Sequence, residues 1–392
     1  MNRIRFKKQN AWMRLIFLLS MLGLSIGDAF NVIYVRRLAE KMVDSSALDL
    51  YVSMPITGMS TMMIVGVICS GIIASKTRGF LPYMRIVGIV TAIGMVVRGL
   101  AFHYWILFAG FLIDGFGYGC IFIAIRYYAF LFEDMQEQMQ ALIHVNGGAF
   151  AGQCMGTILG GILAGQMHYR TVYLLAVIIL LVPILMLYVV KVEQTLHIGS
   201  MKNMFAVLKN KHAIRYLVCI VLPIYTCTVF ISYSVPLAVD SYGFSATVVS
   251  VMMLANYLIA AYASPLMTKL VTKRMSAVIA CLLYCVITGA MILIYSLIGG
   301  MPVMIVAVIL LGLADSFGFS VLLFSYNNTK GKFQYQDNDA LVVYILMTRI
   351  GMSVAPTLIL LYGSTTVLSI VVFAGLAFFM LSGGLRKERH DG

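Results

Sequence analysis

The stretch Ile113-Asp-Gly-Phe-Gly-Tyr-Gly119 has a counterpart in Ala314-Asp-Ser-Phe-Gly-Phe-Ser320. Each reads Asp, a small residue, Phe, Gly, an aromatic residue and a small residue, and each lies within a long apolar run. Asp114 and Asp315 are 201 positions apart in a chain of 392 residues. We therefore expect two similar halves, each with one carboxylate inside an apolar segment.

A carboxylate in the middle of an apolar run is unfavourable by about 2.5–3.5 kcal/mol on insertion scales, so it needs a partner or a water-filled cavity. A buried, hydrogen-bonded structural Asp is the plain interpretation of either residue alone. Recurrence in both halves favours a shared site, because parallel repeats in membrane transporters place equivalent helices around one central site.

The composition predicts an all-α integral membrane protein. Hydrophobic residues make up 61% of the chain and charged residues only 11%, with a mean hydropathy of +0.95, whereas soluble domains have about 25% charged residues. At about 20 residues per span, the chain holds about twelve transmembrane helices and no soluble domain. The spans we expect are 13–35, 51–74, 83–103, 105–130, 141–166, 171–190, 214–238, 246–268, 276–298, 302–326, 340–362 and 366–385.

The basic residues predict the orientation in the membrane. The net charge is +13, and 21 of the 28 Lys and Arg residues fall in the segments on the side of the N-terminus. The segments on the opposite side of the membrane hold five Lys and Arg residues. One of these is Arg98, which we place close enough to a helix end for its side chain to reach the membrane interface. The positive-inside rule then puts both termini in the cytoplasm, and short loops favour a bacterial cell membrane. We assign this charge to the membrane and expect no nucleic-acid partner.

Three further expectations concern organisation and chemistry. The halves are 1–195 and 214–392, joined by a cytoplasmic linker at 196–213. All seven cysteines lie in apolar spans without metal-ligand spacing, so we expect no metal and no cofactor. No phosphate-binding loop of the Gly-x-x-x-x-Gly-Lys-Ser/Thr type and no paired catalytic pattern is present, so we do not expect an enzyme.

Six helices followed by a basic linker and six more resemble the major facilitator superfamily. That family's loop between helices 2 and 3 is similar to the segment 71–79, with Gly71, Lys76 and Arg78 in place. Ser75 stands where the family has an acid, and Gly79 comes one position late. Because the acid helps to latch one conformation in the family, its replacement bears on transport.

Two glycine motifs carry the resemblance further. The fourth span has the family's alternating glycines at Gly115, Gly117 and Gly119, with Phe111 in place of an Arg. The fifth span is similar to the exporters' Gly-x-x-x-Gly-Pro-x-x-Gly-Gly signature, with Thr157 in place of the proline. Its glycines are Gly152, Gly156, Gly160 and Gly161. A glycine face also packs helices closely in any membrane protein, and the added implication here is export.

The resemblance also implies where a site lies, because the family's helices 1, 4, 7 and 10 line the central cavity. The charged residues of the spans agree, with Asp28, Asp114 and Asp315 in helices 1, 4 and 10 and Arg349 in helix 11. We expect an Asp315–Arg349 ion pair, since each alone would be a stranded charge. Asp28 and Asp114 are then candidates for a proton or a cationic substrate, although Asp28 also has a structural alternative, a hydrogen bond to Asn31.

Aromatic residues beside these carboxylates, including Tyr118 and Phe317, suit an amphipathic solute, although at helical spacing they are also typical packing residues. The sequence thus predicts a monomeric secondary active transporter, proton-coupled and inclined to efflux, that moves a small organic solute by alternating access. The alternative from another class is a non-transporting sensor or assembly partner with the same fold, motivated by Ser75.

Overall fold

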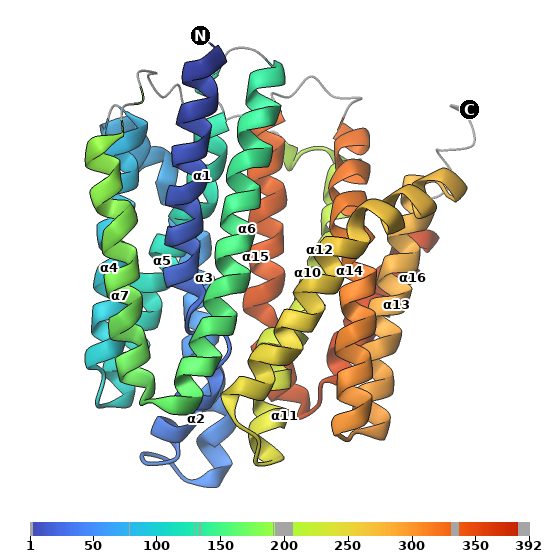
Figure 1. Ribbon diagram of the computed structural model, residues 1–392. Helices are drawn as coiled ribbons and strands as arrows, with labels where there is room; N and C mark the ends of the chain where they lie inside the picture. Colours follow the sequence, from blue (N-terminus) through green and yellow to red (C-terminus); the bar gives the residue numbers. More distant parts are fainter. Residues whose placement is uncertain are drawn as a thin grey trace. The chain divides into compact units, whose positions relative to one another are not determined.

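The computed structural model describes residues 3–77, 79–129, 131–132, 135–190, 192, 207–330 and 337–382. Every regular element in these residues is a helix (Figure 1). The chain divides into two compact units: Met1–Ile198 with Gly243–Ser250, and Gly199–Tyr242 with Val251–Gly392. Arg78 of the loop motif and residues 196–206 of the expected linker lie outside the described residues.

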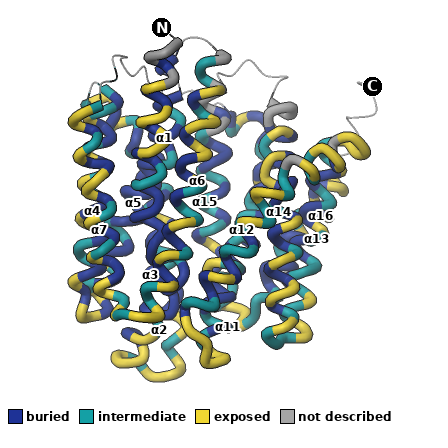
Figure 2. The backbone as a smooth tube through the Cα atoms, viewed as in Figure 1, coloured by how far each residue is buried: buried dark blue, intermediate teal, exposed yellow. Residues whose placement is uncertain are grey.

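The first unit is a bundle in which α5 is packed between two neighbours. Its helices are α1 (Arg3–Ser25), α2 (Asn31–Ala39), α3 (Ser45–Thr77), α4 (Phe80–Leu100), α5 (Tyr104–Ala129), α6 (Met135–Gln166) and α7 (Tyr169–Val189). Helix α5 packs against α3 and α4, while α1 packs against α6 and α7, and α4 also contacts α7. Helix α5 is buried along most of its length, as the dark blue tube in Figure 2 shows.

The second unit repeats this pairing. Its elements are α9 (Lys211–Tyr216), η1 (Leu217–Val221), α10 (Leu222–Val229), η2 (Phe230–Ser234), α11 (Val235–Ser241), α12 (Ala246–Arg274, from Val251 on), α13 (Ala277–Ile298), α14 (Met301–Lys330), α15 (Asp337–Tyr362) and α16 (Thr366–Leu381). Helix α13 packs against α14 and α16, as α4 packs against α5 and α7, and α15 packs against α10, as α6 packs against α1. The internal repeat predicted from the two Asp motifs is thus present in the packing.

The first span is broken, whereas the sequence predicted one helix over 13–35. Helix α1 ends at Ser25 and α2 begins at Asn31. The intervening turn is closed by its own hydrogen bonds, from Phe30 N–H to the Gly27 carbonyl at 2.9 Å and from Asn31 N–H to the same carbonyl at 2.7 Å. A Cβ at Gly27 would overlap the Asn31 side chain, so only glycine fits at this turn.

The segment 211–241 runs as one apolar span with two π-helical turns, η1 and η2. Pro223 and Pro236 follow these turns at the beginning of α10 and α11. A proline has no N–H to donate to the carbonyl four residues earlier and its ring clashes with it, so the helix widens there instead of breaking.

In the part of the chain that the structure describes, ten helical segments are long and apolar enough to cross a membrane by length and composition. With α1 and the shorter apolar helix α16, they match the expected architecture of about twelve spans. The protein is a multi-pass membrane protein.

Candidate functional site

The centre of the first unit holds a buried ion pair. Arg98 of α4 donates from Nη1 to Asp114 Oδ2 of α5 at 2.5 Å, and both side chains are fully buried. The charges are close and shielded from solvent, so their attraction is far stronger than that of a surface pair.

The helices are held close enough for this pair by two glycines. A Cβ at Gly94 of α4 would press on the backbone of Asp114, and a Cβ at Gly110 of α5 would press on the Arg98 side chain. Small residues at such crossings let membrane helices approach each other closely. The ion pair therefore depends on glycines four positions before each charged residue.

Two aromatic rings lie against the guanidinium group. The Arg98 Cζ atom lies 4.1 Å from the centre of the Phe111 ring and 4.3 Å from that of Tyr173. A desolvated guanidinium is attracted to such ring faces. Because Met95 Sδ lies 3.8 Å from Nη1, the positive group is enclosed by partners from three helices.

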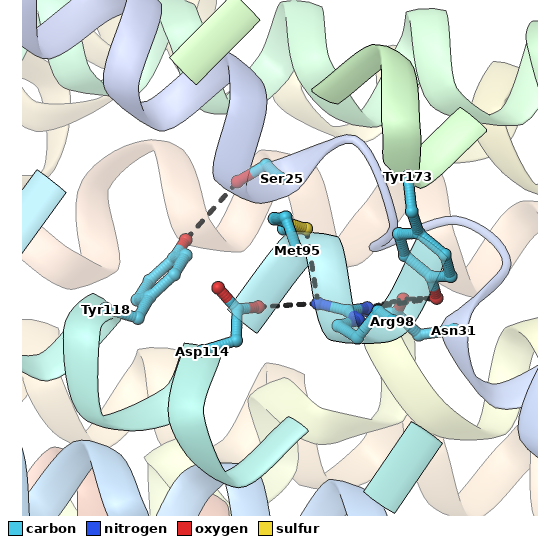
Figure 3. Close-up of polar contacts among 7 residues, drawn as sticks. All are labelled: Ser25, Asn31, Met95, Arg98, Asp114, Tyr118 and Tyr173. Atoms are coloured by element: carbon cyan, nitrogen blue, oxygen red, sulfur yellow. Dashed lines mark hydrogen bonds and ion pairs between the residues drawn. The ribbon is translucent and has the colours of Figure 1, made fainter. Parts of the chain in front are cut away.

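Arg98 also makes hydrogen bonds at the break in the first span. Its Nη2 donates to Asn31 Oδ1 and, at 3.0 Å, to the Tyr173 hydroxyl. The Tyr173 hydroxyl donates to the same Asn31 oxygen at 2.7 Å. Figure 3 shows the guanidinium between Asp114 on one side and Asn31 with Tyr173 on the other. The first residue of α2 is thereby tied to α4 and α7.

We call this pair and the four polar residues around it the N-terminal polar cluster: Ser25, Asn31, Arg98, Asp114, Tyr118 and Tyr173. Ser25 and Tyr118 join it through their hydroxyls, which lie 3.3 Å apart. The second carboxylate oxygen of Asp114, Oδ1, is buried without a hydrogen-bond partner and points away from Arg98, toward the side of Ser25 and Tyr118 (Figure 3). It is an acceptor open to a proton or a polar group.

Asp28 lies in the turn between α1 and α2, beside this cluster. Its side chain is partly exposed, Ser25 and Thr157 lie beside it, and the charges of Arg98 and Asp114 act on it. Asn31, the partner expected as an alternative, is engaged with Arg98 and Tyr173 instead. Two carboxylates and one guanidinium therefore act on one another around a helix break.

The placement of Arg98 at the membrane interface was wrong. Arg98 lies two residues before the last residue of its apolar helix, but its side chain points inward and is fully buried. It is a candidate site residue that the sequence did not reveal, together with Tyr173. The available signal was the glycines at 94 and 110, which mark a close crossing next to both charges.

The second unit places Asp315 beside a different partner from the one expected. Asp315 Oδ1 accepts a hydrogen bond from the Tyr284 hydroxyl of α13 at 2.6 Å. Among the described residues, no ion pair joins Asp315 to Arg349. Helix α14 packs against α13, the helix that precedes it in sequence, whereas α15 packs against α10 of the 211–241 span.

Arg349 is partly exposed on α15, where its Nη1 lies 3.3 Å from Met352 Sδ. Gly351, two residues further on, faces Leu222 and Tyr225 of the 211–241 span. Two residues correspond to about 200° around a helix of 3.6 residues per turn. Arg349 therefore belongs to a different face of α15.

The two aromatic candidates differ in role. Tyr118 is buried in α5 and contacts Ser25 of the cluster. Phe317 is buried and packs edge-on against the Tyr284 ring, with centres 6.1 Å apart. Phe317 thus supports the tyrosine that holds Asp315, and its own ring is not accessible.

The glycine motifs are close-packing faces. A Cβ at Gly115 or Gly119 would overlap a backbone carbonyl of α3, at Met59 or Met63, and one at Gly117 would overlap Thr91 of α4.

In α6, Gly152, Gly156 and Gly160 face the carbonyls of α1, ending at Ile26 in the break of the first span. Gly161 faces Ser250, whose hydroxyl donates to the Thr157 carbonyl at 3.0 Å. The glycines of the fifth expected span therefore let α1 and the first turn of α12 pack closely against α6.

The loop motif is placed only in part. Gly71 lies in α3, and Lys76 is exposed in the last turn of the same helix. Ser75, which replaces the family's acid, is exposed and donates to the Ile72 carbonyl at 2.8 Å.

Comparison with protein families decides the classification. The model of the Major Facilitator Superfamily matches residues 14–356. The chain belongs to the major facilitator superfamily. No curated protein sequence matched the chain.

Solved transporter structures share this fold at low sequence identity. The POT family transporter PepTSo has a TM-score of 0.77 at 10% identity, covering 98% of this chain and 99% of its own. A bacterial homologue of the human lysosomal transporter Spinster, in an inward-facing and occupied conformation, has a TM-score of 0.74 at 12% identity, covering 97% of each chain. The human organic anion transporter MFSD10 has a TM-score of 0.63 at 13% identity, covering 94% of this chain and 98% of its own.

Proposed function

We propose that the protein is a secondary active transporter that moves a small organic solute across the cell membrane, coupled to protons and in the direction of export. The observation that carries the proposal is the buried Arg98–Asp114 pair, which is tied through Asn31 to a break in the first span. Ionisable groups inside a membrane protein are functional candidates because their burial is unfavourable. The Arg98–Asp114 pair is in addition hydrogen-bonded to a discontinuous helix.

The charges in and beside the N-terminal polar cluster support proton coupling. Asp28, Asp114 and Arg98 interact with one another and together carry a net charge of −1 when all are ionised. One added proton makes the group neutral. Since a net charge is far less stable than neutrality in an apolar interior, the group fits a carrier of a single proton.

A proton would also change the geometry at the helix break. A neutral Asp114 attracts Arg98 less than a carboxylate does, and the guanidinium then shifts its hydrogen bonds toward Asn31 and Tyr173. Because Asn31 begins α2, such a shift would alter the angle between α1 and α2. We propose that this links proton binding to alternating access, in which the halves 1–195 and 214–392 move against each other about the linker 196–213.

The direction rests on the resemblance of the α6 glycines to the exporter signature. We further propose that the transporter works as a monomer with both termini in the cytoplasm, as its basic segments indicate. A non-transporting sensor or assembly partner is the second candidate, favoured by the exposed Ser75 at the position of the latch acid.

The test is flux in proteoliposomes that contain the purified chain. An imposed pH gradient is applied with a panel of sugars, organic cations, amphipathic drugs and organic acids, with and without a protonophore. The proposal predicts that at least one solute moves and that the protonophore stops its accumulation. If the folded, oriented protein moves none of them, the sensor or partner function becomes the better account.

A further inference from the structure

Asp315 differs from Asp114 in what surrounds it. Asp114 is fully buried against a guanidinium group, whereas Asp315 is partly exposed and its Oδ1 accepts from a neutral hydroxyl, that of Tyr284. The second carboxylate oxygen of Asp315, unlike Oδ1 of Asp114, is not a buried atom without a hydrogen-bond partner. A mid-helix carboxylate facing lipid would be unfavourable, so its exposed side is expected to face a water-filled route.

Aromatic residues lie near Asp315 on α14 and on the helices beside it. Phe319 follows Asp315 by one turn of α14 and is 38% exposed, so its ring shares the accessible face. The Phe319 ring centre lies 5.8 Å from that of Tyr225 in α10 and 6.1 Å from that of Tyr284 in α13. Tyr225 is itself partly exposed. We call Tyr225, Tyr284, Asp315 and Phe319 the C-terminal aromatic–carboxylate cluster.

The chemistry of this cluster selects a positive charge on an apolar body. A carboxylate attracts a cation, and the faces of aromatic rings attract it further once water is removed. An organic anion would be repelled by Asp315. A sugar requires several converging hydrogen-bond groups, whereas three of these four residues present rings.

We propose that the C-terminal aromatic–carboxylate cluster binds the cationic group of an organic cation, with Asp315 as its counter-ion and Phe319 and Tyr225 as its ring walls. The inference rests on the proposed function, because it names the class of solute that such a transporter takes. It assigns substrate recognition to the second unit and leaves the proton to the charges of the first.

The experiment uses two probes of the same shape and opposite charge, tetraphenylphosphonium and tetraphenylborate. Equilibrium dialysis measures the binding of each to the full chain in detergent, so the result does not depend on transport. We expect saturable binding of the phosphonium and not of the borate. Asp315→Asn should weaken phosphonium binding by about tenfold or more, which is about 1.4 kcal/mol, and Asp315→Glu should recover part of the loss.

Matched variants separate recognition from folding. Phe319→Leu should weaken phosphonium binding several-fold, whereas Phe324→Leu, at a 57% exposed position on the same helix, should bind as the unaltered protein does. Far-ultraviolet circular dichroism and size-exclusion chromatography establish that each variant is folded.

Three outcomes would overturn the inference: equal phosphonium affinity in folded Asp315→Asn, equal binding of the borate, or no saturable phosphonium binding up to about 1 mM. The proposed function fails separately, through absent flux of every solute. If the protein transported a sugar but did not bind the phosphonium, the proposed function would stand and this inference would be wrong.

Discussion

Removing one member of the Arg98–Asp114 pair should destabilise the protein more than removing both. Arg98→Met leaves the Asp114 carboxylate buried without its counter-ion. Asp114→Leu likewise leaves the Arg98 guanidinium group buried without its counter-ion. Breaking a buried pair in this way typically destabilises by about 3–5 kcal/mol. Independent effects would thus add to about 6–10 kcal/mol in the double variant.

The double variant Arg98→Met/Asp114→Leu should instead lie within about 2 kcal/mol of the unaltered protein, because apolar groups then replace both charges. Some loss remains, since Asn31 and the two rings no longer have a guanidinium group between them. The assay is unfolding in mixed micelles of increasing denaturing detergent, followed by helical circular dichroism, for the two single variants and the double.

The control is Arg36→Met in the exposed Arg36–Glu40 pair, whose N–O distance is 3.1 Å. An exposed pair of this kind contributes about 0.2–1 kcal/mol, so this change should be small. If the double variant loses the sum of the two single losses, Arg98 and Asp114 do not act as a pair and the account of the cluster is wrong.

Three further predictions concern packing and hydrogen bonding, and each is measured by the same unfolding assay. Gly110→Ala should lose about 1–3 kcal/mol through overpacking against Arg98, whereas Gly147→Ala, with nothing within 4 Å of the new Cβ, should be neutral or slightly stabilising; equal losses would refute the close-crossing argument. Tyr284→Phe should lose about 1–3 kcal/mol because Asp315 then lacks its donor, and no loss would mean that water replaces it. Arg98→Lys should also be destabilised, because one ammonium group cannot serve Asp114 and Asn31 and fill the space between two rings; an unchanged stability would show that only the charge matters.

Much of the architecture was predictable from the sequence, because apolar segments of about 20 residues and the two Asp motifs are local features. The glycine faces of the fourth and fifth spans were also predictable as close-packing surfaces. The break at Gly27 was not predicted, because a single glycine within an apolar run does not end a membrane helix by itself. The turn also depends on Arg98 and Tyr173, which come from distant segments.

The candidate site was predictable only as a set of carboxylates that need partners. The partners themselves depend on which helices touch and on where each side chain points, and neither is a local property. Arg98 lies near the end of its helix and points inward, so its position along the chain was misleading. Asp315 was expected to pair with the next helix, whereas its own helix packs against the preceding one.

The most direct test of proton coupling through the first unit is solute movement in proteoliposomes with Asp28→Asn, which leaves the Arg98–Asp114 pair neutral overall without the additional carboxylate. Asp49→Asn, at an exposed position of α3, is the matched control. Accumulation driven by a pH gradient and exchange of labelled for unlabelled solute are measured in the same preparation. The account predicts that Asp28→Asn keeps exchange and loses gradient-driven accumulation, while Asp49→Asn keeps both; accumulation by Asp28→Asn at the level of the unaltered protein would contradict it.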